Sequence, residues 1–392
     1  MLEYRGQYTT AKVMIDIIDQ ATVTQIYEFI SHIAFSNPVS IMPDCHKGKG
    51  AVIGFTMEIP DKVIPNVVGV DINCGMLSEN VGVDLFNKIS REELDKSIRR
   101  DIPFGTSVHG KCQFNSDKHG PFWELANYKL KEFTKRFNQR YGTLYKPREF
   151  DQKWLKEKCT EIGMDYDRAL NSIGTLGSGN HFIEIGKSTT TSDYWITVHS
   201  GSRQFGLKVA TYWQRKAGKG QLAYLEGEDM FGYLVDMLFA SIYADENRQV
   251  MQQLIYRITD YPVLESISSV HNFIDFNDFI IRKGAIRSYE NEKMIIPFNM
   301  EDGIIICEGK SNPEWNFSAP HGAGRLFSRS KAKETLSIDP AKHRMDEKEI
   351  YCSKLPIDEL KEAYKDPKVI EDAIGPTATI IDRLMPVLAM KD

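Results

Sequence analysis

The chain has 392 residues, of which 42% are hydrophobic and 26% charged, and its formal net charge is −5. This mixture is typical of a globular protein, so collagen-like, low-complexity and disordered chains are excluded. Because the net charge is negative, a nucleic acid would have to be bound by a local basic patch and not by the charge of the whole molecule.

The sequence shows neither a membrane segment nor a disulfide framework. No apolar run reaches the ~18 residues that a membrane helix needs, and the N-terminal stretch MLEYRGQYTTAKVMID has no signal-peptide core. The six cysteines lie far apart and include no CxxC pair. We therefore expect a reduced, cytoplasmic protein with no membrane partner, in which a special cysteine would be a metal ligand or a catalytic group.

Hydrophobic spacing predicts both helices and strands in the N-terminal half. Residues 24–35 favour an amphipathic helix, and short β-rich pieces broken by glycine and proline follow over 39–82. A helix is expected over 90–101, because Ser90 is a good N-cap and acidic residues follow it. The first half of 128–158 also has helical apolar spacing.

The segment 128–158 combines ten basic residues with seven interleaved aromatic ones. Lysine and arginine can bind phosphates, and exposed aromatic rings can stack on unpaired bases, so this segment is a candidate nucleic-acid surface. The alternative is a solvated amphipathic helix whose aromatic residues face the core.

The C-terminal half mixes loops, strands and a long helix. Gly/Ser-rich loops between strands are expected over 174–207 and a helix over 228–258. Strand-like runs follow over 280–286 and 294–299, and the tail from Asp358 favours helix before a short apolar strand. No internal repeat and no linker rich in proline or serine interrupts the chain, so we expect one large α/β body, a single domain that spans the whole chain (1–392).

Four histidines and one Asp-x-x-Cys pair are candidates for a metal site: His181, His199, His271, His321, Asp71 and Cys74. The histidines stand beside glycine, serine or asparagine in predicted loops, and the spacing of the pair puts carboxylate and thiol on one side of a turn. Such donors suit a borderline transition metal. A thiolate can bridge two cations, and two metals about 3.5–4 Å apart suit phosphoryl chemistry. The alternative is that these are structural histidines of glycine-rich loops.

The stretch HGAGR (321–325) is a second candidate site. Its small residues let the backbone approach a phosphate closely, and the planar guanidinium of Arg325 can grip phosphate oxygens. A neutral imidazole such as that of His321 is also a competent nucleophile toward phosphorus. The alternative is a glycine turn with a structural histidine.

Eight strings, taken in order, resemble motifs of the RtcB family of RNA-splicing ligases. They are MPDCHKGKGAVIG (42–54), VGVDINCGM (68–76), GTLGSGNHFIEI (174–185), HSGSR (199–203), HN (271–272), RKGA (282–285), HGAGR (321–325) and AYKD (363–366). With Lys391, the resemblance extends from Asp44 nearly to the C-terminus. It implies an α+β fold, a single large RtcB-like body of stacked mixed β-sheets flanked by helices.

The resemblance also implies a reaction. His321 would attack the α-phosphate of GTP and carry GMP covalently. The guanylate would pass to an RNA 3′-phosphate, and a 5′-hydroxyl end would displace GMP and seal the strand; a 2′,3′-cyclic phosphate end would first be opened by hydrolysis. The protein would be a GTP-dependent RNA ligase of RNA repair or tRNA splicing, with a helper protein such as archease as a candidate partner.

The resemblance assigns the other site residues as well. Two manganese ions, with Cys74 as the bridge, would be held by Asp71, Cys74, His181, His199 and His271. The guanylate pocket would include Asp44, Asn180, Glu184, Lys283, Asn299, Gly322, Gly324, Arg325, Tyr364 and Lys391. The choice of manganese comes from the family, because this ligand set alone would also permit zinc.

The chain departs from the family pattern at PFNMEDGIII (297–306), where the family has a Pro-Gly-Ser-Met-Gly loop. Asn299 stands where a serine is expected, and Glu301 and Asp302 add negative charge beside the expected triphosphate site. Ala319-Pro320 replaces the usual Cys-Ser before HGAGR. We therefore expect a divergent branch whose differences concern nucleotide specificity and rate.

Two other functions are compatible with these residues. A binuclear-metal phosphoesterase of the calcineurin-like class would use Asp44-x-His46 and the Gly-Asn-His of 179–181, although its Gly-Asp-x-x-Asp and Gly-His-x-His blocks are missing here. A non-ligating member of the family would bind RNA ends without joining them, and the altered stretch 297–306 motivates that alternative.

Overall fold

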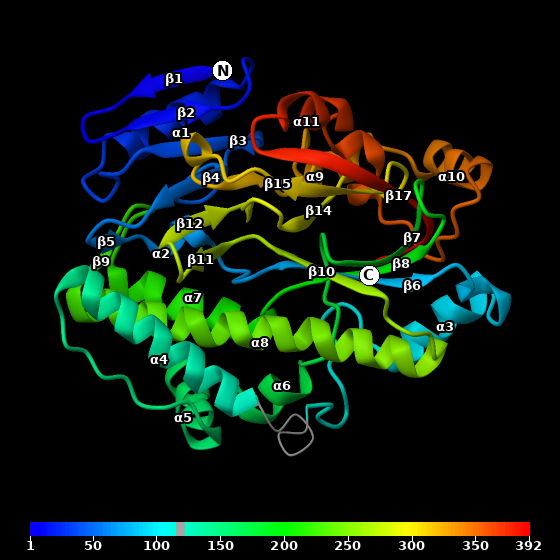
Figure 1. Cartoon of the computed structure of the whole chain (residues 1–392), viewed down its shortest axis with the longest axis horizontal. Helices are drawn as coiled ribbons and strands as arrows, with labels where there is room; N and C mark the ends of the chain where they lie inside the picture. The colour runs from blue at the N-terminus through cyan, green and yellow to red at the C-terminus, as the bar shows by residue number, and fades with distance from the viewer. Residues whose placement is uncertain (115–121) are drawn as a thin grey trace.

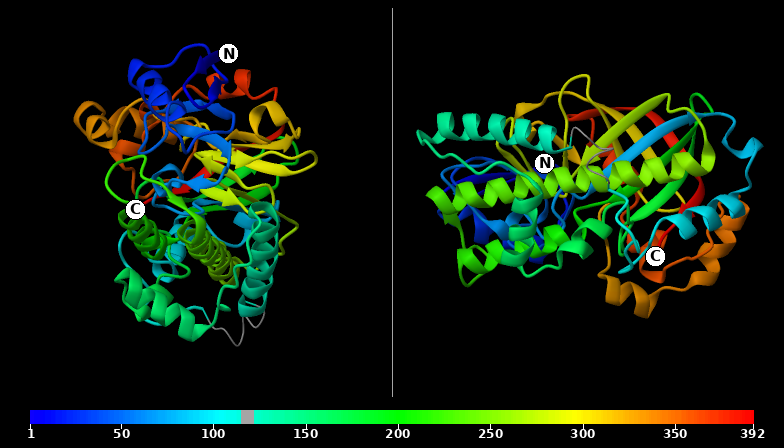
Figure 2. Two further views of the ribbon diagram at one scale, coloured as in Figure 1. Left: turned by 90° about the vertical axis from the view of Figure 1, so that its left-hand side faces the viewer. Right: turned by 90° about the horizontal axis from the view of Figure 1, so that it is seen from below.

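The computed structural model describes residues 1–114 and 122–392. Two β-sheets lie above a layer of long helices in Figure 1, and shorter helices of the C-terminal region cover the other side. The two turned views in Figure 2 show the same layers. This arrangement confirms the expected α+β body of mixed sheets flanked by helices.

The first sheet has six strands, which lie in the order β1 (Leu2–Arg5), β2 (Thr10–Val13), β3 (Val39–His46), β4 (Ile53–Glu58), β12 (Ile280–Lys283) and β11 (Phe273–Asp275). Only β2 and β3 pair in parallel. Helix α1 (Gln20–Ile30) packs beside this sheet and starts earlier than its apolar spacing predicts. The reason is its N-cap, because the Asp19 side chain accepts a hydrogen bond from the Thr22 N–H.

The second sheet is antiparallel and has seven strands, in the order β10 (Glu265–Val270), β6 (Gly75–Gly82), β8 (Tyr194–Ser200), β7 (Phe182–Ser188), β17 (Ala378–Met390), β15 (Ile304–Gly309) and β14 (Lys293–Pro297). Its outermost strands approach each other, since the Ile295 N–H of β14 donates to the Ser269 hydroxyl of β10 at 2.8 Å. The sheet therefore curls into a nearly closed barrel, and β17 is much longer than the short strand expected at the C-terminal end.

Short elements connect these sheets. Two-stranded sheets are formed by β5 (Lys62–Val63) with β9 (Leu225–Glu226), and by β13 (Ala285–Arg287) with β16 (Ser318–Pro320). The short helices are α2 (Pro65–Val68), α6 (Tyr166–Asn171), α9 (Arg329–Thr335), α10 (Ile338–Glu347) and α11 (Pro367–Ala373). The 3₁₀ turns are η1 (Leu85–Asn87), η2 (Pro313–Trp315), η3 (Ile357–Glu359) and η4 (Lys361–Ala363).

Helix α8 (Gly227–Thr259) is the centre of the helical layer, between the sheets and α4 (Phe122–Tyr141) (Figure 1). Residues on nearly every side of this helix are buried, because the sheets and other helices cover it. The buried guanidinium of Arg248 donates to the carbonyls of Asn73 and Ser200, at 2.8 Å each. This helix thus holds the loops at one end of β6 and β8 in place.

The remaining helices confirm and correct the sequence predictions. Helix α3 (Arg91–Asp101) has the predicted Ser90 cap, completed by Glu93 as a capping box. In the basic segment 128–158, which extends from α4 into α5 (Gln152–Ile162), most aromatic rings pack into the core and Tyr128 is exposed. Helix α7 (Arg203–Ala217) begins within the stretch expected to be loops and strands.

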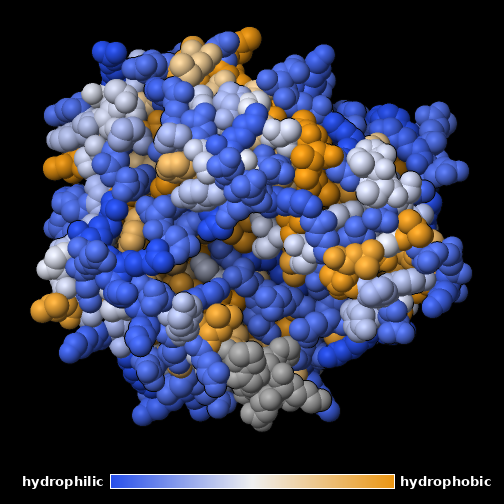
Figure 3. Space-filling model, viewed as in Figure 1, coloured by the Kyte–Doolittle hydropathy of each residue, from blue (hydrophilic) through white to orange (hydrophobic). Residues whose placement is uncertain are grey.

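The surface is consistent with a chain of mixed charge. The face shown in Figure 3 is largely hydrophilic, with apolar residues in small separate groups. No helix in the described part of the chain combines the length and the apolar character needed to cross a membrane.

Candidate active site

The five residues predicted as metal ligands come together at one end of the seven-stranded sheet. Asp71 and Cys74 lie on the turn that leads into β6, His181 immediately precedes β7, His199 lies in β8, and His271 follows β10. Strands β10, β6, β8 and β7 are neighbours in this order, so their adjacent ends bring together loops far apart in the sequence. The sheet register is therefore what builds the cluster.

The ligand atoms converge closely. The Cys74 thiol sulfur lies 3.2 Å from Nε2 of His199 and 3.4 Å from Nε2 of His181. Asp71 Oδ2 lies 2.9 Å from His181 Nε2, and His199 Nε2 lies 3.4 Å from His271 Nε2. Two groups of three ligands result, Asp71–Cys74–His181 and Cys74–His199–His271, with the atoms of each within 4.8 Å of one another. Cys74 belongs to both.

Backbone contacts orient two of the imidazoles. His181 Nδ1 lies 2.9 Å from the Leu176 carbonyl, and His199 Nδ1 lies 3.1 Å from the Asn180 carbonyl. An Nδ1–H that donates to a carbonyl leaves the Nε2 lone pair directed at the cluster, as metal-binding histidines require. Within the described residues, Nδ1 of His271 is buried and has no hydrogen-bond partner.

The protonation states also suit a cation. Burial, followed by the charge of a neighbouring histidine, lowers the pKa of His199 and His271 well below the ordinary value, so both rings are neutral. Burial raises the pKa of Asp71, but His181 outweighs it and brings the value to about 2. Burial and then Asp71 raise the pKa of the Cys74 thiol. The cluster thus offers a carboxylate, two neutral imidazoles and a thiol, which are donors that suit a bound transition metal.

His321 lies beside this cluster, on the turn after β16. Its Nδ1 lies 2.5 Å from Oδ2 of Asp44, which is fully buried in β3. The rings of His321 and His271 are 4.7 Å apart between centroids. The turn needs a glycine at 324, because φ is +75° there and a Cβ would lie 2.6 Å from the Asp44 carbonyl oxygen.

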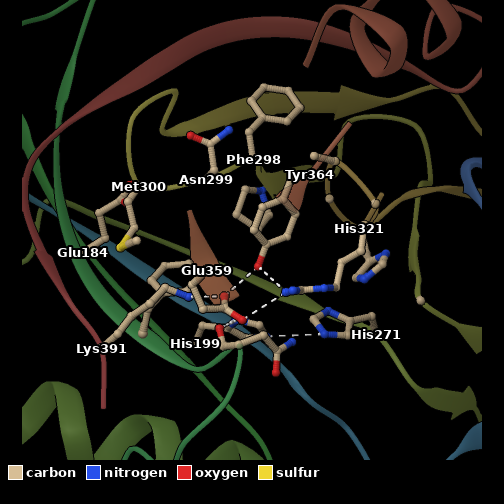
Figure 4. Close-up of a pocket in the computed structure, with 18 of the residues that line it drawn as sticks. Glu184, His199, His271, Phe298, Asn299, Met300, His321, Glu359, Tyr364 and Lys391 are labelled. Atoms are coloured by element: carbon tan, nitrogen blue, oxygen red, sulfur yellow. Dashed lines mark hydrogen bonds and ion pairs between the residues drawn. The ribbon is translucent and has the colours of Figure 1, made fainter. Parts of the chain in front are cut away.

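A cavity opens in front of His321 (Figure 4). Of the predicted residues, it is lined by Asn180, Glu184, Asn299, Gly322, Gly324, Arg325, Tyr364 and Lys391, together with His199, His271 and His321. Glu184 is buried, and burial raises its pKa to about 8 while the charge of Lys391 lowers it. The cavity thus adjoins the metal-ligand cluster and contains both acidic and basic groups.

Two predicted pocket residues do not line this cavity. Asp44 lies behind His321, as its hydrogen bond to the imidazole requires. Lys283 is buried, and its ammonium donates to the carbonyls of Lys49 and Asn66. Lys283 therefore braces the glycine loop HKGKG (46–50) in this structure.

The acidic residues of the altered loop are paired away from the cavity. The Arg344 guanidinium binds both carboxylate oxygens of Glu301, at 2.7 and 2.8 Å. Lys361 Nζ lies 2.9 Å from Asp302 Oδ1. The side-chain oxygen of Asn299 accepts hydrogen bonds from the backbone N–H groups of Glu301 and Asp302, at 2.9 and 3.1 Å, and so closes the turn. The negative charge expected beside the pocket is thus balanced by nearby cations.

Glu359 is a site residue that the sequence interpretation missed. It lines the cavity, is only 1% exposed, and accepts hydrogen bonds from Arg325, Tyr364 and Lys391. It lies in a polar stretch of the C-terminal region, IDELKEAYKD (357–366), in which no spacing distinguishes it from neighbouring acids.

Comparisons with known proteins agree with this geometry. The family described as tRNA-splicing ligase RtcB matches residues 25–392. The RNA-splicing ligase RtcB of Escherichia coli (strain K12) is 31% identical over 391 residues, which cover 90% of each chain. The tRNA-splicing ligase RtcB of Nanoarchaeum equitans is 27% identical, over 96% of this chain and 91% of its own length. By its motifs, its fold and these relatives, the chain belongs to the RtcB family.

Proposed function

We propose that this protein joins an RNA 3′-phosphate or 2′,3′-cyclic phosphate end to a 5′-hydroxyl end, through a guanylate carried on His321. As a member of the RtcB family, the chain is an RNA ligase, and RNA is its substrate. The observation that carries the proposed reaction is the position of His321, between a buried carboxylate and a cluster of metal ligands, facing a cavity.

The first step is nucleophilic attack by His321. In the neutral ring, an Nδ1–H that donates to Asp44 places the lone pair on Nε2, from which it can form a bond to the α-phosphorus of GTP. The bond from this phosphorus to the bridging oxygen breaks, and pyrophosphate leaves with that electron pair. Asp44 stabilises the positive charge that develops on the ring, as a buried carboxylate does for a catalytic histidine.

The chain's residues fit two divalent metal ions, which we propose to be manganese. Asp71, Cys74 and His181 would hold one ion, and Cys74, His199 and His271 the other. Bound there, the metals would neutralise phosphate oxygens and stabilise the leaving group. Cys74 would bind as a thiolate shared by both ions, so its proton must be released when metal binds.

In the later steps, an RNA 3′-phosphate oxygen attacks the guanylate phosphorus and the bond to His321 breaks. The 5′-hydroxyl of the second end then attacks the activated 3′-phosphate, GMP leaves, and the hydroxyl proton is released. Glu184, Tyr364, Arg325 and Lys391 line the cavity in which we place the nucleotide. We assign the enzyme to RNA repair or tRNA splicing in the cytoplasm, with archease as a candidate helper.

Incubation with α-labelled GTP and Mn²⁺ tests this proposal. Wild-type protein should retain an acid-labile label, the His321→Ala variant should retain none, and the exposed His343→Ala control should behave like wild type. A label that persists in His321→Ala would refute the assigned nucleophile. Hydrolysis of phosphoesters without any label would favour the phosphoesterase alternative, and RNA-end binding without joining would favour a non-ligating member.

A further inference from the structure

Glu359 is the most densely paired carboxylate of the cavity. Lys391 Nζ and the Tyr364 hydroxyl each lie 2.6 Å from its Oε2, and Arg325 Nη1 lies 3.1 Å from its Oε1. Figure 4 shows the side chains of Tyr364 and Lys391 directed toward Glu359. All three partners also line the cavity, so one buried anion fixes a large part of its wall.

Lys391 lies near two buried carboxylates, Glu359 and Glu184, but forms a hydrogen bond with Glu359. Its ammonium donates to Glu359, and its charge also reaches Glu184. In the described structure, Oε1 of Glu184 is buried and has no hydrogen-bond partner. A buried polar atom without a partner is costly, and it is what a site that awaits a ligand presents. The pairing of Lys391 with Glu359 therefore keeps Glu184 available.

Charge balance supports the same interpretation. Arg325, Arg329 and Lys391 are three cations around Glu359, with Arg329 Nη2 at 3.5 Å from Oε1. Without an anion in their midst they would repel one another and turn toward solvent or toward Glu184. Asp358 Oδ2 also lies 3.5 Å from Arg329 Nη1, so the two carboxylates leave these three cations a surplus of one positive charge for a phosphorylated ligand.

We propose that Glu359 is the positioning residue of this pocket: it holds Arg325, Tyr364 and Lys391 in their places before a ligand arrives, and it keeps Lys391 from closing on Glu184. The ligand class, a purine nucleotide, rests on the proposed function, whereas the positioning itself does not. Glu359 acts through its neighbours and need not touch the reacting phosphate.

The Glu359→Gln variant keeps the shape and removes the charge. The GTP concentration that gives half-maximal labelling of His321 should rise about tenfold or more, since charge-assisted hydrogen bonds are lost, while the rate at saturating GTP changes much less. Mn²⁺ affinity should stay unchanged, because Glu359 contacts none of the five metal ligands. The Glu359→Asp variant should show a smaller rise, because it retains the charge.

A matched control is Asp236→Asn. Asp236 is also buried and paired, with Lys158 Nζ at 3.0 Å and Trp213 Nε1 at 2.7 Å, but it lies in α8 away from the cavity. The Asp236→Asn variant should have a lower thermal stability, but the GTP concentration that gives half-maximal labelling should not rise. An unchanged GTP requirement in Glu359→Gln would show that Glu359 is only structural and would overturn the proposal. If Glu359→Gln does not fold, Glu359→Asp carries the same comparison.

A crystal structure of Glu359→Gln gives a readout that needs no nucleotide. We expect the Lys391 ammonium to move within hydrogen-bonding distance of Glu184. If Lys391 and Tyr364 keep their wild-type positions, the proposal is wrong, whatever the enzyme does. If wild-type protein takes no label from GTP, the proposed function fails, and this crystal structure still decides whether Glu359 positions its neighbours.

Discussion

Asp44 and His321 are 277 residues apart in the sequence, yet Oδ2 of the one lies 2.5 Å from Nδ1 of the other. The carboxylate orients the ring and, in the neutral imidazole, favours the tautomer with the proton on Nδ1 and the lone pair on Nε2. Asp44→Asn should therefore reduce the rate of His321 labelling by about 10²–10⁴-fold, with Mn²⁺ affinity unchanged. The assay is time-resolved labelling with α-labelled GTP, and a rate within threefold of wild type would contradict this role.

Cys74 is common to both groups of predicted metal ligands. We expect Cys74→Ser to weaken the binding of both metal ions and to abolish joining, because a shared ligand is lost from two sites at once. Calorimetric titration with Mn²⁺ measures the affinity and the number of ions. Cys159→Ser, at another buried cysteine, is the matched control and should bind metal as wild type does. Loss of only one of two ions would show that Cys74 does not bridge.

Metal affinity should rise with pH. Burial, with Asp71, holds the pKa of the Cys74 thiol above its usual value, so the thiol is protonated without metal and must release its proton to bind. Affinity should therefore increase by up to about tenfold per pH unit between pH 6 and 8. Measured Mn²⁺ dissociation constants give the slope. The Cys74→Ser variant should show a flatter dependence, and equal slopes would contradict thiolate ligation.

Glu184 should make the protein less stable at alkaline pH. Its folded-state pKa, about 8, lies above the ordinary value of 4.5. Between pH 4.5 and about pH 8, Glu184 holds a proton in the folded chain that it lacks in the unfolded chain. The contribution of Glu184 to the free energy of unfolding is therefore fully present below about pH 4.5 and is lost as the pH rises through about 8. Glu184→Gln cannot ionise and should retain it.

The measurement is the free energy of unfolding of both proteins at pH 5 and pH 8.5. Relative to wild type, the free energy of unfolding of Glu184→Gln should be higher at pH 8.5 than at pH 5 by on the order of a few kcal/mol, since one pKa unit is about 1.4 kcal/mol. The exposed Glu92→Gln variant should show no such shift. A constant difference across the pH range would mean that Glu184 is ionised throughout.

The exposed basic residues of α4 stay our candidate RNA surface. Lys131, Lys135 and Arg136 are exposed on this helix, whereas Phe133 and Phe137 are buried beneath them. Reversing the three charges should weaken RNA binding, with the loss greatest at low salt. Binding is measured by fluorescence anisotropy at several salt concentrations. A Lys88, Lys96 and Lys187 triple reversal on other elements is the control, and equal losses in both would reject α4 as the surface.

Much of the fold could be predicted because local signals were strong. Ser90 with its acidic first turn predicts α3, and the spacing of the apolar residues within 228–258 predicts α8. The start of α1 was misplaced because Asp19 as N-cap outweighs the apolar spacing. The length of β17 escaped prediction because its pairing with β7 and β15 is set by distant residues.

The site was predictable to the extent that its residues stand in motifs. The metal ligands and His321 were identified through short strings, and the structure brings them together. Glu359 escaped because its role depends on three partners, none of which predicts an acid at that position. For Lys283, a motif alone does not fix the position of the side chain: the motif predicts a pocket residue, whereas in the structure the ammonium donates to the carbonyls of Lys49 and Asn66. The assignment of each site role stays a prediction.

Asp44, the hydrogen-bond partner of His321, belongs to a different sheet from the strands that carry the predicted metal ligands. Asp44 is part of the six-stranded sheet, while Cys74 and the histidines around it are attached to the seven-stranded one. The proposed reaction centre therefore lies between two sheets. We expect the relative position of these sheets to change at a lower temperature than the one at which either sheet unfolds. On slow heating, transfer of guanylate to the protein should cease at a temperature where circular dichroism still reports intact secondary structure.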